Sequence, residues 1–217
     1  MNKKETNYLD ISGKKINIKD SALLLSEDFS SGEINPKDWI EVGDASWTVK
    51  DGALEGKWDK DKKLRHGQIY TRKTFKGNIL MEFDAQTILP SDHDIIWWWG
   101  VKLNEKQDKW ESGYLGALGG WWSNQAGVEK IEGKKVYMAK TPLFKLEPGK
   151  EYKIQCGMVN GTVFFFADGQ LIIEFLDPDP LAQKTPGHIG FGIFQSHIKI
   201  GKLKVYRPKW DKIKVSH

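Results

Sequence analysis

Tryptophan is concentrated in one stretch of the chain. Six of the ten tryptophans lie between Trp97 and Trp122, five of them in the runs Trp97-Trp98-Trp99 and Trp121-Trp122. Packing alone rarely calls for two such runs, because an indole is large, is seldom fully buried and carries an N–H that needs a partner. Flat aromatic faces beside glycines and a few titratable groups are typical of a surface that stacks sugar rings and hydrogen-bonds their hydroxyls. The residues favour a carbohydrate-binding groove, with a tryptophan-rich core as the alternative.

Strand alternation divides these tryptophans between two faces. On a strand through residues 93–101, Trp97 and Trp99 share a face with His93, whereas Trp98 shares the other face with Ile96. We assign Trp97 and Trp99 to the groove and Trp98 to the core, although the reverse assignment fits almost as well. Trp121 and Trp122 would complete the aromatic platform.

Acid–base chemistry could come from two histidines and a tyrosine. Elimination next to a uronate needs a base for the C5 proton, an acid for the leaving oxygen and a group that neutralises the carboxylate. His93 and His197 are candidate bases, and Tyr114 is the candidate acid. Three further side chains could contact the substrate carboxylate: Arg72, Lys130 and Gln195. The leading hypothesis is therefore a lyase or dehydratase that acts on an acidic oligosaccharide.

Two other functions remain open. A non-catalytic carbohydrate-binding module needs the tryptophans but not the histidines. A glycoside hydrolase could use Glu82 and Asp84, which lie two residues apart on one strand face, although such acids are often simply solvated. Asp177 and Asp179 could hold a structural Ca²⁺ in a proline-rich turn, or form a plain turn. No other cofactor is expected.

Composition narrows the classes of partner. Lys and Arg number 33 against 29 Asp and Glu, and a net charge of +4 is too small for a nucleic-acid footprint, though compatible with an acidic glycan. No apolar run approaches 18 residues, so no membrane span is expected. The N-terminus lacks the hydrophobic segment of a signal peptide, and the compartment stays open. The lone Cys156 excludes an intrachain disulfide and lies in the apolar phase of a strand.

The elements that must position these residues are strands. Asp51-Gly52, Asn160-Gly161 and Asp168-Gly169 each separate β-forming runs, which predicts three hairpins. Apolar and polar residues alternate over residues 79–86 and 151–158, and no helical period exceeds about two turns. We predict an all-β, two-sheet antiparallel jelly-roll β-sandwich over residues 1–217 as one domain, with a polar leader at about 1–20 and a basic tail at about 207–217.

Several of these runs resemble a known superfamily. The hairpin after Trp47, the strand 67–70, the run 164–175 and the glycine-rich strand from Gly187 are similar to the concanavalin A-like lectin/glucanase superfamily over about residues 26–206, and especially to YesU-like bacterial proteins and keto-disaccharide hydrolase-like domains. The resemblance implies a jelly roll with a sugar groove on its concave face. Of the catalytic acids of the glucanases only the first two are matched, at Glu82 and Asp84, so glucanase-type hydrolysis is not implied.

Overall fold

Three tight turns build the central hairpins. The computed structural model describes residues 7–61, 63–64, 66–120 and 124–213. Both residues of each dipeptide have positive φ, as at Asp51 (51°) and Gly52 (67°), and this conformation matches the twist of the flanking strands. The predicted hairpins at Asp51-Gly52, Asn160-Gly161 and Asp168-Gly169 are therefore confirmed.

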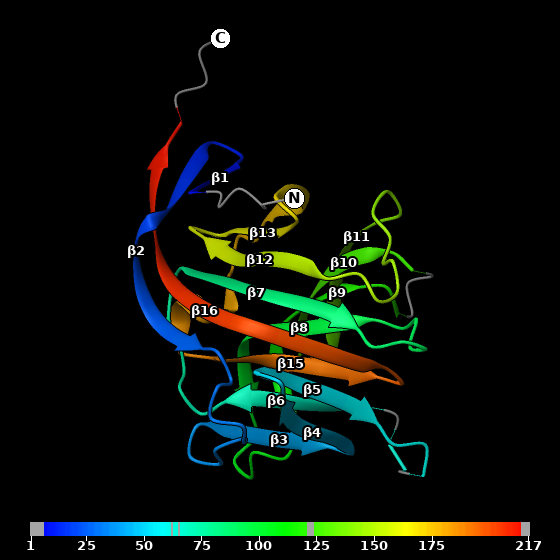
Figure 1. Ribbon diagram of the computed structural model, residues 1–217. Helices are drawn as coiled ribbons and strands as arrows, with labels where there is room; N and C mark the ends of the chain where they lie inside the picture. The colour runs from blue at the N-terminus through cyan, green and yellow to red at the C-terminus, as the bar shows by residue number, and fades with distance from the viewer. Residues whose placement is uncertain (1–6, 62, 65, 121–123, 214–217) are drawn as a thin grey trace.

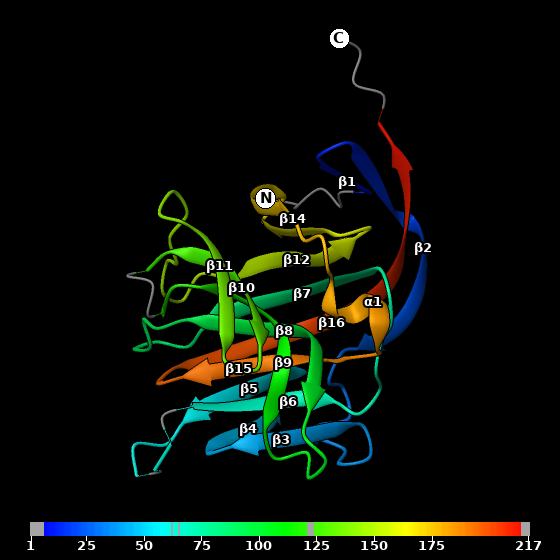
Figure 2. The same ribbon diagram turned by 180° about the vertical axis from the view of Figure 1, so that it is seen from behind.

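The strands form two antiparallel sheets (Figures 1 and 2). In the described chain, sheet A contains β1 (Tyr8–Ile11), β2 (Lys14–Glu27), β16 (His197–Lys212), β7 (Ile79–Thr87), β12 (Tyr152–Val159), β13 (Thr162–Ala167) and β14 (Gln170–Leu176), in that order. The hairpin of β4 (Ala45–Lys50) and β5 (Ala53–Trp58) joins sheet A because β5 pairs with β16. The predicted all-β sandwich is confirmed.

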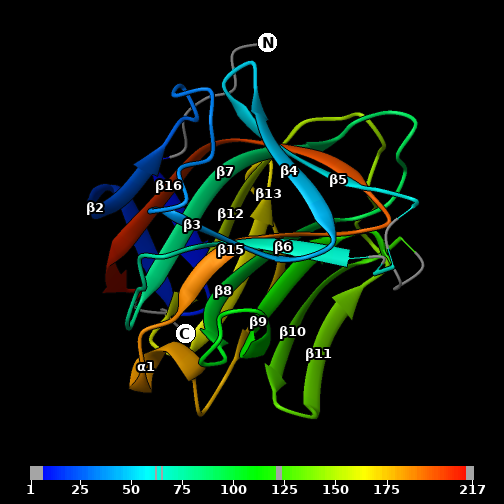
Figure 3. The same ribbon diagram turned by 90° about the horizontal axis from the view of Figure 1, so that it is seen from below.

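Sheet B carries the tryptophan run. Its strand order is β11 (Lys135–Thr141), β10 (Ala126–Glu132), β9 (Trp110–Leu118), β8 (Ile95–Leu103), β15 (His188–Phe194), β6 (His66–Thr71) and β3 (Trp39–Gly43). The short helix α1 (Leu181–Lys184) lies near β8 (Figure 3). No helix among the described residues is long and apolar enough to cross a bilayer.

The main core lies between the two sheets. The alternating apolar residues of β7 and β12 point inward, as the sequence predicts, and Cys156 is fully buried among them. Trp97 of sheet B packs edge-on against Phe83 and Phe165 of sheet A, with ring centroids 5.9 and 4.8 Å away. These aromatic contacts join the inner faces of the two sheets.

The two chain ends are more ordered than their polar composition suggests. Residues 14–27 form the long strand β2, and β16 continues through the expected basic tail as far as Lys212, paired with β2. Leu9 and Ile11 of β1 pack with Leu80 and Phe164 on the outer face of sheet A. The expected leader and tail are therefore partly strands, in which most side chains are exposed or half-buried and a few, such as Ile16 and Pro208, are buried.

A second apolar cluster covers the outer face of sheet B. In Figure 2, β9, β10 and β11 run steeply across the view, whereas β6 and β3 run nearly level, so the sheet is strongly twisted along its width. The cluster contains residues of β3, β6, β8, β9 and β10: Ile40, Val42, Tyr70, Ile96, Trp98, Val101, Leu103, Leu115, Ala117 and Ile131. Each of these side chains is less than 10% exposed, so the cluster is largely shielded from solvent.

Candidate functional site

The three consecutive tryptophans of β8 divide between two environments. Trp97 and Trp99 are fully buried between the sheets, and Trp99 stacks on Tyr114 with centroids 5.1 Å apart. Trp98 projects to the outer face of sheet B. The assignment of Trp97 and Trp99 to the groove is thus corrected, since Ile95 sets the inner phase of the strand. A bulge after Trp99 turns Val101 to the outer face as well.

The glycines of β9 make room for these indoles. A Cβ on Gly116 would overlap the indole of Trp97, and one on Gly113 would approach a methyl group of Val101 to 2.9 Å. Side chains of β8 therefore fill the space beside these two glycines.

An apolar pocket of about 240 Å³ lies on the outer face of sheet B. The rings of Trp98 and Trp110 form part of its lining, with centroids 5.4 Å apart and planes tilted by 36°. The remaining lining combines apolar and polar residues: His66, Gln68, Ile96, Leu115, Glu129, Ile131, Val136, Ile193 and Phe194. A mostly apolar hollow with a few convergent polar groups is the usual form of a small-ligand site.

Two polar atoms of this pocket are buried without a partner. Within the described chain, neither the Nε1–H of Trp98 nor Oε1 of Gln68 has a hydrogen-bond partner, and the two side chains are 2% and 6% exposed at residue level. The amide nitrogen of Gln68 lies 3.3 Å from Nδ1 of His66. Gly192 on β15 lies between Gln68 and Trp98, and a Cβ at this position would lie 3.0 Å from the indole nitrogen of Trp98. The wall of the pocket thus contains one unpaired donor and one unpaired acceptor, both shielded by the surrounding side chains.

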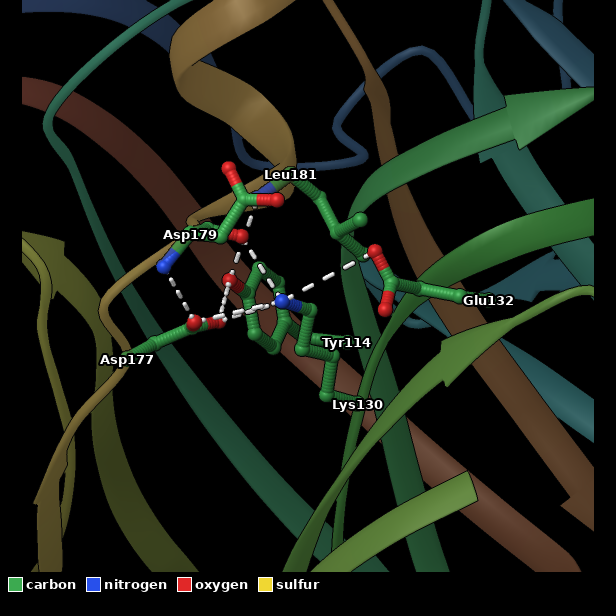
Figure 4. A network of polar contacts seen from close by, with 6 residues as sticks. All are labelled: Tyr114, Lys130, Glu132, Asp177, Asp179 and Leu181. Carbon is green, nitrogen blue, oxygen red and sulfur yellow. Dashed lines mark hydrogen bonds and ion pairs between the residues drawn. The ribbon is translucent and has the colours of Figure 1, made fainter. Parts of the chain in front are cut away.

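Tyr114 and Lys130, both expected at the site, do meet, in a network with Asp177 (Figure 4). The Tyr114 hydroxyl donates to Oδ2 of Asp177 at 2.5 Å, and Nζ of Lys130 lies 3.1 Å from both carboxylate oxygens. Lys130 also donates to the backbone carbonyl of Asp179 at 2.7 Å and lies 3.7 Å from Glu132. Burial and the carboxylate raise the pKa of Tyr114 well above its ordinary value. The network joins β9 and β10 to the segment after β14.

Of the two possibilities for Asp177 and Asp179, these contacts favour a plain turn over a calcium site. The Asp177 carboxylate accepts hydrogen bonds from the hydroxyl of Tyr114, from Nζ of Lys130 and from the backbone N–H of Asp179, whose nitrogen lies 2.9 Å away. The described residues contain no group of three or more His, Cys, Asp and Glu side chains suited to hold a metal ion.

The two predicted catalytic histidines lie apart from Tyr114. His93 is exposed in the segment before β8, and Trp99, the register partner of Tyr114, is six residues further on, a separation of about 20 Å along a strand. Nε2 of His197 lies 3.5 Å from a carboxylate oxygen of Glu55, at the edge of sheet A. The structure therefore does not bring the expected base and acid together.

The remaining predicted residues are dispersed. Gln195 has φ of 54° in the turn between β15 and β16. The guanidinium of Arg72 donates to the carbonyl of Pro36 at 2.5 Å and to Gln107 at 3.2 Å, so it ties surface loops together. Trp121 and Trp122 lie outside the described residues.

Glu82 and Asp84 belong to the opposite sheet from the pocket. Glu82 accepts a hydrogen bond from Gln155 at 2.8 Å and lies 3.1 Å from Nζ of Lys153. Asp84 lies 3.8 Å from Nζ of Lys202. Both acids are partly exposed on sheet A and each has a lysine partner. Such contacts are usual for acids on the solvent-facing side of a strand.

Asp94 is a buried carboxyl directly before β8. It is fully buried, and burial raises its pKa to about 7. The Ser196 hydroxyl and the Phe194 backbone are near enough to offset part of this rise, although neither carboxyl oxygen has a partner in hydrogen-bond geometry in the described chain. Gly120 packs against the carboxyl, where a Cβ would lie 2.7 Å from Oδ2. Asp94 thus carries a proton in a large fraction of molecules near neutral pH.

Sequence reasoning missed most of the pocket. His66, Gln68 and Tyr70 share one face of β6, opposite the buried Ile69. The polar side chains on this face were the signal in the sequence that could have indicated the pocket. Trp110 carried no such signal, because it follows a polar loop and stands alone. Its contact with Trp98 depends on how β8 and β9 pair.

No family model matches the chain. An extracellular exo-alpha-L-arabinofuranosidase of Streptomyces chartreusis is 27% identical over 192 residues, a match that covers 81% of this chain and 19% of that protein. The chain therefore spans about a fifth of the length of this curated relative.

Solved structures share the arrangement of the two sheets. A protein of unknown function with a galectin-like fold from Bacillus subtilis has a TM-score of 0.67 and 18% identity, covering 88% of this chain and 98% of that chain. The carbohydrate-binding module CBM66 from Bacillus subtilis gives 0.62 and 13%, covering 79% and 97%. The beta-glucanase of Bacillus licheniformis gives 0.60 and 11%, covering 87% and 99%. The chain shares the two-sheet jelly-roll fold of these proteins, which is the fold that its sequence resemblance implied.

Proposed function

We propose that this protein is carbohydrate-active and binds a glycan in the pocket on the outer face of sheet B. The observation that carries the proposal is the pair of buried, unpartnered polar atoms, Trp98 Nε1–H and Gln68 Oε1, in a mostly apolar pocket. A sugar hydroxyl both donates and accepts, so one sugar ring can satisfy both atoms while its C–H face rests on an indole. A purely apolar ligand would leave both atoms unpaired.

The similar proteins support the ligand class. One is described as an arabinofuranosidase, one as a carbohydrate-binding module and one as a beta-glucanase. Because these names cover both binding and hydrolysis, they support a glycan ligand but do not favour one of these two functions over the other.

Of the three functions that the sequence left open, binding fits the pocket best. Among the described lining residues, the ionisable side chains are His66 and Glu129. Elimination next to a uronate also needs a group that neutralises the sugar carboxylate, and hydrolysis usually employs two carboxyl groups. A binding site needs neither.

β-Elimination on an acidic oligosaccharide is the second candidate, and His66 favours it. Its imidazole lies at the pocket wall, next to the amide of Gln68, where it could accept a proton from a bound sugar. In this scheme His66 takes the part of the base that the sequence assigned to His93 or His197.

Glycan binding can be tested by titrating tryptophan fluorescence with arabinan, β-1,3-glucan and galacturonan oligosaccharides. We expect at least one to bind the unmodified protein, and Trp110→Ala to weaken that binding about tenfold or more, as loss of an aromatic anchor does. Trp210→Ala is the matched control, because Trp210 is also partly buried but packs on the far side of sheet A. Absence of binding to all three glycans, or equal losses in the two variants, would contradict the proposal.

Elimination has a separate readout. Its unsaturated product absorbs in the ultraviolet, and His66→Ala should slow its formation about 100-fold, the usual contribution of a general base. His93→Ala and His197→Ala serve as comparisons. If galacturonan oligosaccharides bind without any rise in absorbance, elimination is wrong and the binding function stands. New reducing ends without absorbance would indicate hydrolysis.

A further inference from the structure

We infer that the pocket accepts a single terminal sugar unit, so that the protein recognises the ends of glycan chains rather than their internal segments. This inference rests on the proposed glycan binding and specifies which part of a glycan the site reads. It follows from the shape of the outer face of sheet B, from the polar atoms of the pocket and from the exposed residues at its margin.

Among the described residues, buried apolar side chains border the pocket along one row of sheet B. Val42 pairs in register with Gln68, and Ile96 pairs with Gly192, so apolar side chains flank the pocket along this row of the sheet. Val42 and Ile96 are 7% and 4% exposed. Ile131, on the β10 side, is equally buried. An internal glycan segment that continued along this row would meet these side chains, and making room among them would cost apolar burial.

The size of the pocket matches one ring. Its volume of about 240 Å³ lies below the roughly 300–1,000 Å³ of sites that enclose drug-sized molecules. One pentose or hexose fits such a space, whereas a disaccharide would extend out of it.

The buried polar atoms also favour a terminal unit. An internal sugar unit has hydroxyl positions taken up by linkages on both sides, whereas the terminal non-reducing unit keeps all but its anomeric position free. Gln68 Oε1 and Trp98 Nε1–H lie in the buried part of the pocket, so their partners must come from free hydroxyls that enter first. A linkage pointing inward would leave at least one of these atoms unpaired, which costs about 1–3 kcal/mol.

The margin of the pocket offers a place for the rest of the chain. Val136 lines the pocket and is 53% exposed, and Met138, two residues further along the edge strand β11, is 46% exposed. Met138 pairs in register with the lining residue Glu129. Units beyond the first would leave the pocket across these two exposed side chains.

The test compares each glycan in three forms: intact polymer, a partial hydrolysate with chains about tenfold shorter, and the methyl glycoside of its monomer. Arabinan, β-1,3-glucan and galacturonan serve as probes, with binding followed by tryptophan fluorescence. For a glycan that binds, end recognition predicts that half-saturation needs about tenfold less mass of hydrolysate than of polymer. It also predicts that the methyl glycoside competes.

Two variants locate the terminal unit. Gln68→Leu should abolish competition by the methyl glycoside, with Gln68→Glu, which keeps an acceptor, as the second variant if the first does not fold. Met138→Ser should weaken oligosaccharide binding severalfold and leave the methyl glycoside unaffected. Equal or tighter binding of polymer at equal mass, with no competition by the methyl glycoside, would overturn end recognition while glycan binding stands. If no form of any probe binds, the proposed function fails and the inference fails with it.

Discussion

The indoles of Trp98 and Trp110 lie 5.4 Å apart on the outer face of sheet B, although a polar loop separates them in the chain. Trp98 is 2% exposed and fixed by the cluster around it, whereas Trp110 is partly exposed at the pocket. Trp97, one residue before Trp98, belongs to the core between the sheets. Neighbouring tryptophans should therefore respond differently to truncation.

We expect Trp97→Ala to cost about 3–5 kcal/mol in the free energy of unfolding, because it removes a fully buried ring from the main core. Trp110→Ala should cost clearly less, since part of that ring is already in solvent. Denaturant unfolding of the two variants measures the difference. Equal losses would mean that Trp110 is as firmly packed as Trp97.

Gly116→Ala should destabilise the protein by about 1–3 kcal/mol, the usual cost of overpacking, because the new methyl group would overlap the indole of Trp97. Gly201→Ala is the matched control within sheet A, since no heavy atom lies within 4 Å of its Cβ position. Its unfolding free energy should change by less than about 0.5 kcal/mol. Thermal melts of both variants test the packing of Trp97 directly.

Stability should fall as pH rises from about 4 to above 7. Burial raises the folded-state pKa of Asp94 to about 7 from its ordinary value of 3.8, so the folded protein holds a proton that the unfolded chain has released in this interval. The loss should reach a few kcal/mol and be complete above pH 7.

Asp94→Asn should remove most of this pH dependence, because an amide does not ionise. The exposed Asp92 provides the control, and Asp92→Asn should retain the profile of the unmodified protein. Unfolding free energies between pH 4 and 8.5 decide the matter. An unchanged pH profile in Asp94→Asn would show that other groups determine the acid–base response.

The network around Asp177 should be sensitive to loss of one partner. Lys130→Met leaves a carboxylate whose side chain is 5% exposed without its cation, and this should cost about 3–5 kcal/mol. Combining it with Asp177→Leu should recover part of the loss, because the uncompensated charge is then gone. Lys102→Met breaks the exposed pair with Glu111, at 66% and 46% exposure, and should change the free energy of unfolding far less, because solvent screens exposed charges. Similar losses for Lys130→Met and Lys102→Met would contradict a tightly coupled network.

Much of the fold could be predicted from local chemistry. The dipeptides Asp51-Gly52, Asn160-Gly161 and Asp168-Gly169 favour positive φ by themselves, so the hairpins were evident from the chain. The alternation in β7 and β12 identified their inner residues, including Cys156, because a strand with one core face repeats every second residue.

The sequence predicted the type of candidate site but not the residues that form it. The density of tryptophan indicated a ligand surface, but two alternating faces of β8 were both apolar, so periodicity could not say which face turned inward. The pairing with β9 and β15 settled that Trp97 and Trp99 face sheet A and that Trp98 faces outward.

The sequence by itself determined the class of fold and the hairpins, because turn conformation and side-chain alternation depend on neighbouring residues. Only the tertiary structure decided which residues meet. Trp98 and Trp110 come together through strand register, Gln68 joins them across β15, and Tyr114 and Lys130 find Asp177 about 50 residues or more away along the chain. Such contacts depend on sheet order and twist, which arise from the packing of all the strands at once.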